Sequence, residues 1–233
     1  MRIRAVVFDL FGTLVPEFPL SVWDGMLNGM ASALGADRGA FRHAWTGTVV
    51  ERQTGGFPDV ASNLREIARR IGVEPADAAI REATAVREEA YRRWFRPQPG
   101  AVEMLRWLKG KAYGTAVVSM SAPDAPALWA ASPLDGLIDV RVFSCEVGLR
   151  KPDPAIYLAA TEGLGVAPAA CLYIGDGSYR ELTGAAASGM TPVRIVDPAA
   201  TEAVLRPDVD DWQGREIRSL LEVVGLLEPA GGR

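Results

Sequence analysis

The sequence predicts an α/β fold, a doubly wound and mostly parallel sheet with a helical domain inserted after the first strand. Short apolar runs recur along the chain, and each is followed by a helical pattern. The first two runs lie about a hundred residues apart, and the segment between them is itself helical in pattern. Apolar runs of this length, bounded by glycine, aspartate and proline, suit strands that are covered on both faces. Their alternation with helices is typical of a parallel sheet.

Five apolar runs are the expected strands, at residues 3–8, 115–120, 140–144, 171–174 and 192–196. Four further segments have the pattern of helices, at residues 101–109, 123–131, 154–165 and 179–188. Each of these helical segments precedes a strand or stands between two strands. This is the connection that a doubly wound sheet requires.

Residues 17–96 are predicted to form the helical insert. A first apolar stripe begins at Leu20 and ends at Gly35, and a second begins at Val60 and ends before Gly72. A third helical pattern follows Pro75, and the stiff segment Arg-Pro-Gln-Pro-Gly then returns the chain to the sheet. We therefore expect a core domain at residues 1–16 and 97–233 and a cap domain at residues 17–96.

Composition excludes several classes of protein. A chain of 233 residues with 48% apolar side chains can bury a core, so it is not disordered or dependent on disulfides. Its two cysteines, Cys145 and Cys171, have no metal-like spacing and are expected to be reduced thiols. We find no apolar run near the ~18 residues of a membrane span and no secretory signal, and so expect a cytoplasmic protein. A formal charge of −4 without a basic block predicts no nucleic-acid or membrane partner. Nothing in the sequence indicates an oligomeric state.

Two polar side chains stand at the ends of the first two predicted strands. Asp9 follows the first strand, and Gly12 then allows a sharp turn; Ser119 ends the second strand. Ligands of open α/β sheets collect at such strand ends, and hydroxyl groups there can hold an anion. Each residue taken alone also fits a structural role, as a helix-capping aspartate or a turn serine.

Two later segments add a cation and two carboxylates. Lys151 precedes a Pro-Asp-Pro run, although only three of the 25 basic residues of this chain are lysines. A lysine here fits a need for a compact point charge, although taken alone it fits a structural role equally well. Asp176 ends a predicted strand between two glycines, and Glu181 follows about one turn later.

The four segments in this order resemble the haloacid dehalogenase superfamily of hydrolases, in the subgroup with a helical cap after strand one. The resemblance covers nearly the whole chain. It implies a Rossmann-like doubly wound parallel sheet core with an inserted α-helical cap domain, and it is specific for superfamily but not for substrate. The segments are DLFGTL, the strand that ends in Ser119, KPDP, and GDGSYREL followed by GAAASGM.

The resemblance implies a role for each matching residue. Asp9 would be the nucleophile, forming an aspartyl-phosphate that water then hydrolyses. Lys151 would neutralise the nucleophile and the transferred phosphoryl group. Thr13 would brace the nucleophile loop. Phosphoryl oxygens would be bound by Ser119 and Lys151, together with Gly12 and Ser121.

A Mg²⁺ cofactor is also implied. Its ligands would be Asp9, the backbone carbonyl of Phe11 and Asp176, since Mg²⁺ prefers oxygen ligands and substrate phosphate. Glu181 stands where the family pattern usually has aspartate. The resemblance gives it a place outside the direct ligands, bound to a metal-held water or to Lys151.

The sequence departs from the family pattern at Phe11. Phosphatases of the family usually have a second aspartate there, which protonates the leaving group and activates the water. Phenylalanine cannot transfer a proton, and loss of a positioned acid/base typically costs ~10²–10⁴ in rate. A backbone carbonyl survives any substitution, so we expect the metal site to be kept.

Three hypotheses remain open. The first is a Mg²⁺-dependent phosphatase or phosphohydrolase that uses a good leaving group, or an acid/base group from the substrate or from the cap. The second is a 2-haloacid dehalogenase, a branch that commonly has an aromatic residue at the Phe11 position and needs no metal; Asp176 counts against it. The third is a catalytically weak binding protein of the same fold. The cap candidates for acid/base chemistry are His43, Glu51 and Arg52.

Two further classes are excluded by what the sequence lacks. The cap has no lysine to form a Schiff base in a phosphonatase, and the first turn lacks the Gly-x-Gly-x-x-Gly of a dinucleotide site. Of the three hypotheses we favour the first, with a small phosphorylated metabolite as substrate and the cap choosing it. The aromatic residues Trp23, Phe41, Trp45 and Phe57 are expected to line a pocket or fill the cap core.

Overall fold

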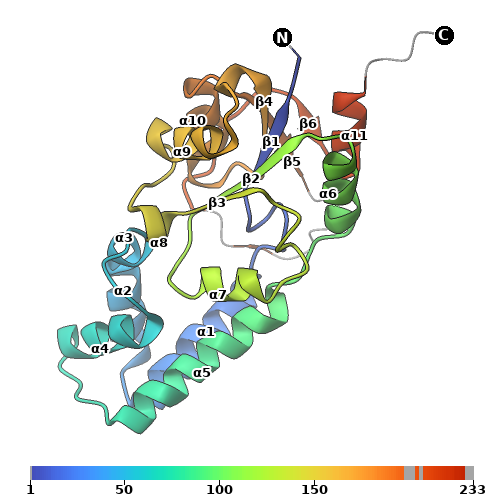
Figure 1. Ribbon diagram of the computed structural model, residues 1–233. Coiled ribbons are helices and arrows are strands. Elements are labelled where there is room, and N and C mark those ends of the chain that lie inside the picture. The colour runs from blue at the N-terminus through green and yellow to red at the C-terminus, as the bar shows by residue number, and fades with distance from the viewer. Residues whose placement is uncertain (1, 197–202, 205–206, 229–233) are drawn as a thin grey trace.

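In the computed structural model, a six-stranded sheet is covered by helices on both faces, with a helical unit beyond one end of it (Figure 1). The structure describes residues 2–196, 203–204 and 207–228. All strand pairings are parallel, in the order β3-β2-β1-β4-β5-β6, which confirms the doubly wound α/β fold. The strands are β1 (Ala5–Phe8), β2 (Gly114–Ser119), β3 (Val140–Phe143), β4 (Cys171–Gly175), β5 (Thr191–Ile195) and β6 (Glu216–Ile217).

Alternate residues of the central strands face opposite layers of helices. Val6 and Phe8 of β1 belong to one buried cluster, and Ala5 and Val7 belong to another. The first cluster includes side chains of α6 (Ala101–Gly110) and α11 (Glu222–Leu227). The second includes side chains of α9 (Pro154–Leu164) and α10 (Glu181–Ala187). The sheet is therefore buried on both faces, as its apolar runs predict.

The five strands predicted from the sequence are present close to their expected bounds. Short elements were missed, namely β6, α8 (Ser144–Val147) and η1 (Pro168–Ala170), whereas the helix expected at residues 123–131 is present as α7 and begins at Ala125. The helix expected at 179–188 is divided, because a 3₁₀ turn, η2 (Ser178–Arg180), precedes α10. The full range of α7 is Ala125–Ala130.

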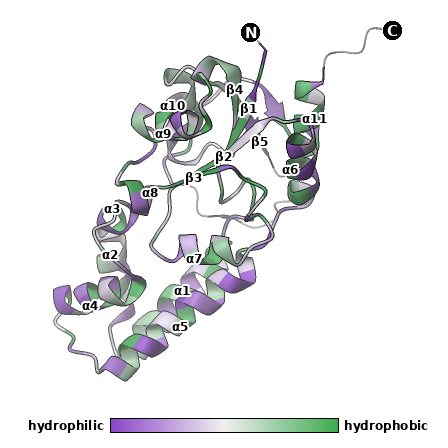
Figure 2. Ribbon diagram, viewed as in Figure 1, coloured by the Kyte–Doolittle hydropathy of each residue, from purple (hydrophilic) through white to green (hydrophobic). Residues whose placement is uncertain are grey.

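Five helices form the insert between β1 and β2, and four of them, α1, α2, α4 and α5, share a hydrophobic cluster that is distinct from the two in the core. In Figure 1, α1 and α5 run side by side as its long pair, and they also contact each other most. Both alternate hydrophilic and hydrophobic residues along their length (Figure 2), as helices with one buried face do. The helices are α1 (Leu20–Ala33), α2 (Arg38–Gly47), α3 (Val49–Gln53), α4 (Val60–Arg70) and α5 (Asp77–Trp94). We propose that residues 17–96 form the cap as one unit.

Helices α2 and α3 were not predicted. Helix α2 begins after Asp37, whose side chain accepts a hydrogen bond from the backbone N–H of Ala40 at 2.9 Å. Its buried residues are Phe41, Ala44 and Trp45, a stripe too short to be evident in the sequence. None of the helices in the described part of the chain is long and apolar enough to span a membrane.

Candidate active site

Two carboxylates stand at the point where the strand order of the sheet reverses. Asp9 directly follows β1, and Asp176 directly follows β4, its parallel neighbour. Asp9 is fixed there by a hydrogen bond from its backbone N–H to the carbonyl of Ile174, at 2.8 Å. Parallel strands present their carboxyl ends at one edge of the sheet, where ligands of this fold bind. The sequence thus places both carboxylates at the switch point.

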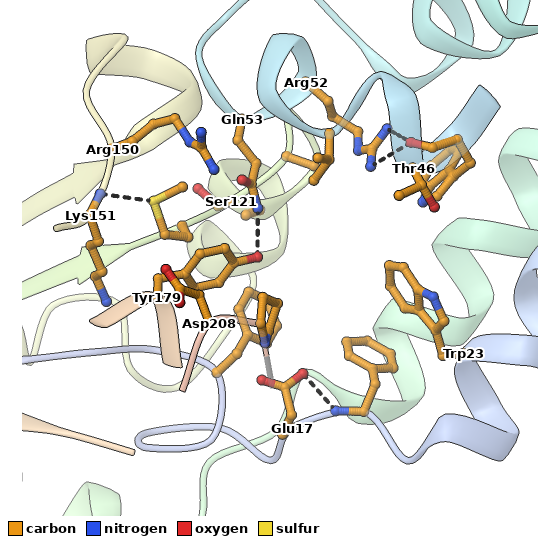
Figure 3. A pocket seen from close by; sticks show the side chains of 18 of the residues that line it. Glu17, Trp23, Thr46, Arg52, Gln53, Ser121, Arg150, Lys151, Tyr179 and Asp208 are labelled. Atoms are coloured by element: carbon orange, nitrogen blue, oxygen red, sulfur yellow. Dashed lines mark hydrogen bonds between the residues drawn. The ribbon is translucent and has the colours of Figure 1, made fainter. Parts of the chain in front are cut away.

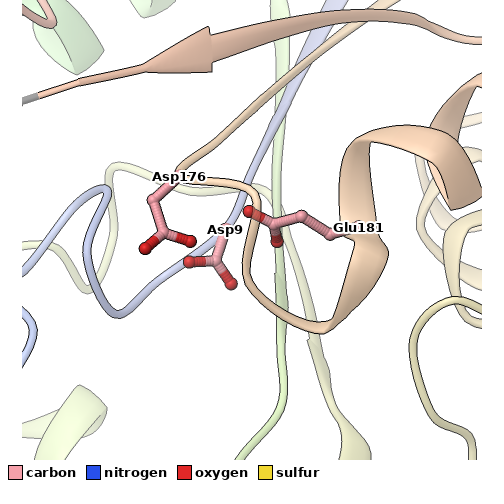
Figure 4. A group of neighbouring side chains, drawn as sticks. All are labelled: Asp9, Asp176 and Glu181. Carbon is pink, nitrogen blue, oxygen red and sulfur yellow. The ribbon is translucent and has the colours of Figure 1, made fainter. Parts of the chain in front are cut away.

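Glu181 joins these two residues in a buried cluster. One carboxylate oxygen from each of Asp9, Asp176 and Glu181 lies within 4.8 Å of the other two. All three side chains are buried, and Figure 4 shows their carboxylates converging from two loops and the start of α10. The three grouped ligand atoms are carboxylate oxygens, which suit a hard divalent cation such as Mg²⁺.

Lys151 is the cation of the cluster. Its Nζ donates to Asp9 Oδ1 at 2.5 Å and to Glu181 Oε2 at 2.6 Å. Glu181 is held further by the hydroxyl of Tyr173 at 2.8 Å and by the backbone N–H of Gly177 at 3.0 Å. Its carboxylate is therefore fixed directly against Lys151, one of the two places that the family resemblance implies.

Burial and charge shift the pKa values of this cluster. Burial raises the pKa of Asp9, and the negative charge of Asp176 raises it further, against the effect of Lys151. For Glu181, burial and the charge of Asp9 raise the pKa to about 8. Burial alone would lower the pKa of Lys151, but the charges of Asp9 and Glu181 outweigh it and raise this pKa. Burial and mutual repulsion therefore disfavour the ionised forms of Asp9 and Glu181, and Lys151 offsets this effect only in part.

The loop after β1 packs closely against the cluster. Gly12 has a φ of +81°, and a Cβ at this position would lie 2.7 Å from Asp176 Oδ2. Any other residue here would be strained and would collide with that carboxylate. The neighbouring carbonyl of Phe11 belongs to the same loop. The close approach keeps the backbone against the carboxylates, as a metal site with a carbonyl ligand requires.

Two buried hydroxyl groups beside the cluster lack a partner. The Oγ1 of Thr13 and the Oγ of Ser119 are both fully buried, and neither finds a hydrogen-bond partner among the described residues. Buried polar groups are nearly always hydrogen-bonded in proteins. Ser119 ends β2, the parallel neighbour of the strand that leads to Asp9, so both residues lie at the same edge of the sheet.

A cavity of about 600 Å³ separates the cap from the sheet edge, and Lys151 is the point at which it meets the carboxylates (Figure 3). Ser121 lines it as well, with its backbone N–H bonded to Ser144 Oγ at 2.9 Å. The volume suits a small metabolite. The lining residues from the cap and the segment leading into it include Glu17, Phe18, Trp23, Trp45, Arg52, Gln53, Arg87 and Tyr91.

Phe11 forms part of the cavity wall. Its ring lies 6.1 Å from Phe18, 6.1 Å from Tyr91 and 5.9 Å from Phe95, between ring centroids. It packs against both the core cluster and the cap cluster. The residue that replaces the usual aspartate is therefore a bridge between two hydrophobic cores, a role that a carboxylate could not fill.

The structure separates the cap residues that sequence reasoning grouped together. His43 and Glu51 are exposed and lie outside the cavity lining, so neither is placed for acid/base chemistry there. Arg52, by contrast, is buried and lines the cavity. Of the aromatic candidates, Trp23 and Trp45 line the cavity, whereas Phe41 and Phe57 are buried away from it.

Sequence reasoning missed several polar residues of the cavity, among them Glu17, Arg87, Arg150 and Tyr179. The Tyr179 hydroxyl accepts a hydrogen bond from Gln53 Nε2 at 2.9 Å, which links the loop after Asp176 to the cap. Tyr179 and Arg180 have positive φ values of 56° and 52°. Such strain in non-glycine residues gathers at functional sites, but no sequence signal marks it.

Comparison with known proteins gives a consistent result. A family model described as a hydrolase, haloacid dehalogenase-like hydrolase, matches residues 3–189. A glyceraldehyde 3-phosphate phosphatase of Methanopyrus kandleri is 26% identical over 97% of this chain and 98% of its own length. An (S)-2-haloacid dehalogenase 4A of Burkholderia cepacia is 27% identical over 83% of each chain. The crystal structure of a HAD phosphatase from Thermococcus onnurineus, 23% identical, superposes with a TM-score of 0.65 over 97% of this chain and 98% of its own.

Proposed function

Since this chain belongs to the haloacid dehalogenase-like hydrolase family and is a hydrolase, we propose that it is a Mg²⁺-dependent phosphohydrolase acting on a small phosphorylated metabolite. One observation supports this choice above others. Asp176 adds a third carboxylate to a buried cluster whose only cation among the described residues is Lys151. Carboxylates gathered in a buried space repel one another, and a divalent cation bound between them would relieve that repulsion, so this arrangement favours a protein that binds such a cation.

The proposed metal ligands are Asp9, Asp176 and the backbone carbonyl of Phe11, with Glu181 held against Lys151. Mg²⁺, when bound, would supply the positive charge that these carboxylates lack and that a phosphoryl group attracts. This role accounts for the glycine at position 12, since the loop must approach the Asp176 carboxylate closely.

The reaction proceeds by two displacements at phosphorus. The Asp9 carboxylate attacks the phosphorus atom, the bond to the leaving-group oxygen breaks, and an aspartyl-phosphate forms. Water then attacks this phosphorus, releases inorganic phosphate and restores the Asp9 carboxylate. Lys151 stabilises negative charge on Asp9 and on the phosphoryl oxygens, and Ser119 donates its free hydroxyl to one of them.

The side chain at position 11 has no carboxyl group that could protonate the leaving group. Phe11 is held among three aromatic rings, so protonation of the departing oxygen falls to another group or is not required. This favours substrates whose leaving group departs as an anion, such as acyl phosphates. Glu17 and Asp208 are the cavity-lining carboxylates that could serve less activated substrates.

A panel of phosphorylated metabolites, acyl phosphates and 2-haloacids tests the proposal, each assayed with Mg²⁺ and with EDTA. We expect phosphate release that needs Mg²⁺, and its abolition in Asp9→Asn without change in the circular dichroism spectrum. Asp24→Asn, an exposed cap variant, is the matched control and should keep full activity. Undiminished phosphate release by Asp9→Asn would refute the nucleophile assignment.

The second candidate is a 2-haloacid dehalogenase, which the aromatic residue at position 11 favours. In that reaction Asp9 would displace halide from carbon without a metal. The charge of Asp176 would then stand near an anionic substrate, beside the carboxylates of Asp9 and Glu181. Release of chloride from 2-chloropropionate in EDTA, with no turnover of phosphates, would decide for this candidate.

A further inference from the structure

The cap end of the cavity holds a buried positive charge that no carboxylate pairs with. Arg52, on α3, is 4% exposed, and its guanidinium donates only to neutral acceptors: the Trp45 carbonyl, Thr48 Oγ1 and Asn63 Oδ1. No ion pair joins it to a carboxylate in the described part of the chain. Its guanidinium lies 3.9 Å from the centroid of the Trp45 ring.

A second guanidinium stands beside it. Arg87 is 1% exposed and lies over the same Trp45 ring, 5.1 Å from its centroid. Its Nε and Nη2 donate to Asp124 at 2.7 and 3.1 Å, so Asp124 is already engaged. Two buried guanidinium groups and one carboxylate leave a net charge of +1. Burial and the charge of Arg87 lower the pKa of Arg52 to about 9, a sign that its charge lacks compensation.

Buried N–H donors at this end also lack acceptors. Arg87 Nη1 and Trp45 Nε1 find no hydrogen-bond partner among the described residues. Their residues line the cavity, as does Arg52. Buried donors without acceptors are rare and costly, and a group of donors around a positive charge matches the hydrogen-bonding pattern of a carboxylate or phosphate.

Arg52 is well separated from the carboxylate cluster. In Figure 3, Lys151 and Arg52 lie on opposite sides of the view, with Ser121, Gln53 and Tyr179 between them. In the same view the carboxylates of Glu17, near the bottom, and Asp208, left of centre, lie away from Arg52, near the top. A molecule that spans the cavity would therefore meet Lys151 at one end and Arg52 at the other.

We propose that Arg52, with Arg87 and Trp45, forms a subsite for a second oxyanion of the substrate, a carboxylate or a second phosphate. This inference rests on the proposed function, because the first oxyanion is the phosphoryl group at Asp9. The substrate class is then a small metabolite that bears a phosphate at one end and an anionic group at the other. A neutral alcohol or sugar phosphate would leave Arg52 unpaired.

Two substrate pairs test the subsite. In the first pair, 3-phosphoglycerate has a carboxylate where glycerol 3-phosphate has a hydroxymethyl group. In the second pair, ribulose 1,5-bisphosphate has a second phosphate that ribulose 5-phosphate lacks. We expect the wild type to prefer the doubly anionic member of at least one pair, and the pair identifies the oxyanion. In Arg52→Met the ratio of the two kcat/KM values should fall by about 30-fold or more, mainly through KM, because a buried charge pair is lost.

The variants are chosen to separate binding from folding. Arg52→Lys keeps the charge and should restore part of the ratio. Arg42→Met removes an exposed cap arginine and should leave the ratio unchanged. An Arg52→Met variant that lowers kcat/KM equally for both members of a pair, or a wild type that discriminates within neither pair, would overturn the subsite.

A binding measurement separates this inference from the proposed function. Calorimetric titration of 3-phosphoglycerate, ribulose 1,5-bisphosphate and their singly anionic partners into Asp9→Asn, with and without Arg52→Met, needs no turnover. If the wild type hydrolyses no phosphate but Asp9→Asn binds the doubly anionic compound through Arg52, the proposed function fails and the subsite stands. If phosphates are hydrolysed but binding and turnover do not depend on Arg52, the subsite fails alone.

Discussion

The two ends of the cavity are built from opposite charges. At the sheet end, three buried carboxylates surround Lys151, with a formal net charge of −2 when all are ionised. At the cap end, Asp124 pairs with Arg87, and Arg52 has no carboxylate partner among the described residues, which leaves a net charge of +1. The sheet end is therefore rich in carboxylates, and the cap end is rich in guanidinium groups.

The two ends of the cavity are positioned by different kinds of structure. The sheet end is set by strand termini, which fix a few side chains at a place that the topology decides. The cap end is set by helix packing, which can move an arginine into or out of the cavity without disturbing the sheet. We therefore propose that chemistry at phosphorus belongs to the core and that the choice of substrate belongs to the cap.

The largest effect on stability is expected from breaking the ion pair of the cap end. Arg87→Met leaves Asp124, whose side chain is 11% exposed, without its partner and should lower the free energy of unfolding by about 3–5 kcal/mol. Urea unfolding measures this change. Arg93→Met, on the same helix, breaks an exposed pair with Glu89 and should cost at most about 1 kcal/mol. Equal losses in the two variants would contradict a buried ion pair between cap and core.

A smaller effect is expected where the two domains meet. Phe11→Asp removes three ring contacts and should lower the free energy of unfolding by about 2 kcal/mol. It also restores a carboxyl group to the cavity wall, so turnover of an alkyl phosphate should rise by about 10²-fold. Phe11→Asn loses the same contacts without gaining an acid and should show no such rise. An Asp variant that is no faster than the Asn variant would place proton transfer elsewhere in the cavity.

The sheet end could be predicted from the sequence because its side chains follow strands that are evident as apolar runs. The positions of Asp9 and Asp176 follow from one rule, that parallel strands present their carboxyl ends at one edge of the sheet. The family resemblance allows two positions for Glu181, against a metal-held water or against Lys151, and the structure has the second. The hydrogen bond from Tyr173 to the same carboxylate could not be predicted, because a tyrosine within an apolar strand has the pattern of a core residue.

The cap end could not be predicted in the same way. Amphipathic patterns show which face of a helix is buried, but they do not show whether that face meets another helix or a cavity. Arg52 was named beside His43 and Glu51, and only packing separates the buried arginine from the two exposed residues. Arg87 lies within the apolar pattern of α5, and its partner Asp124 is 37 residues away.

Direct titration of Mg²⁺ into the metal-free protein is the measurement closest to the central claim, that the buried carboxylates hold a divalent cation. The account predicts one site filled at millimolar Mg²⁺ or below, weakened at least tenfold in Asp176→Asn and unchanged in Asp77→Asn, an exposed aspartate of the cap. A wild type that binds no Mg²⁺ at millimolar concentrations, or an Asp176→Asn variant that binds it equally well, would contradict the account.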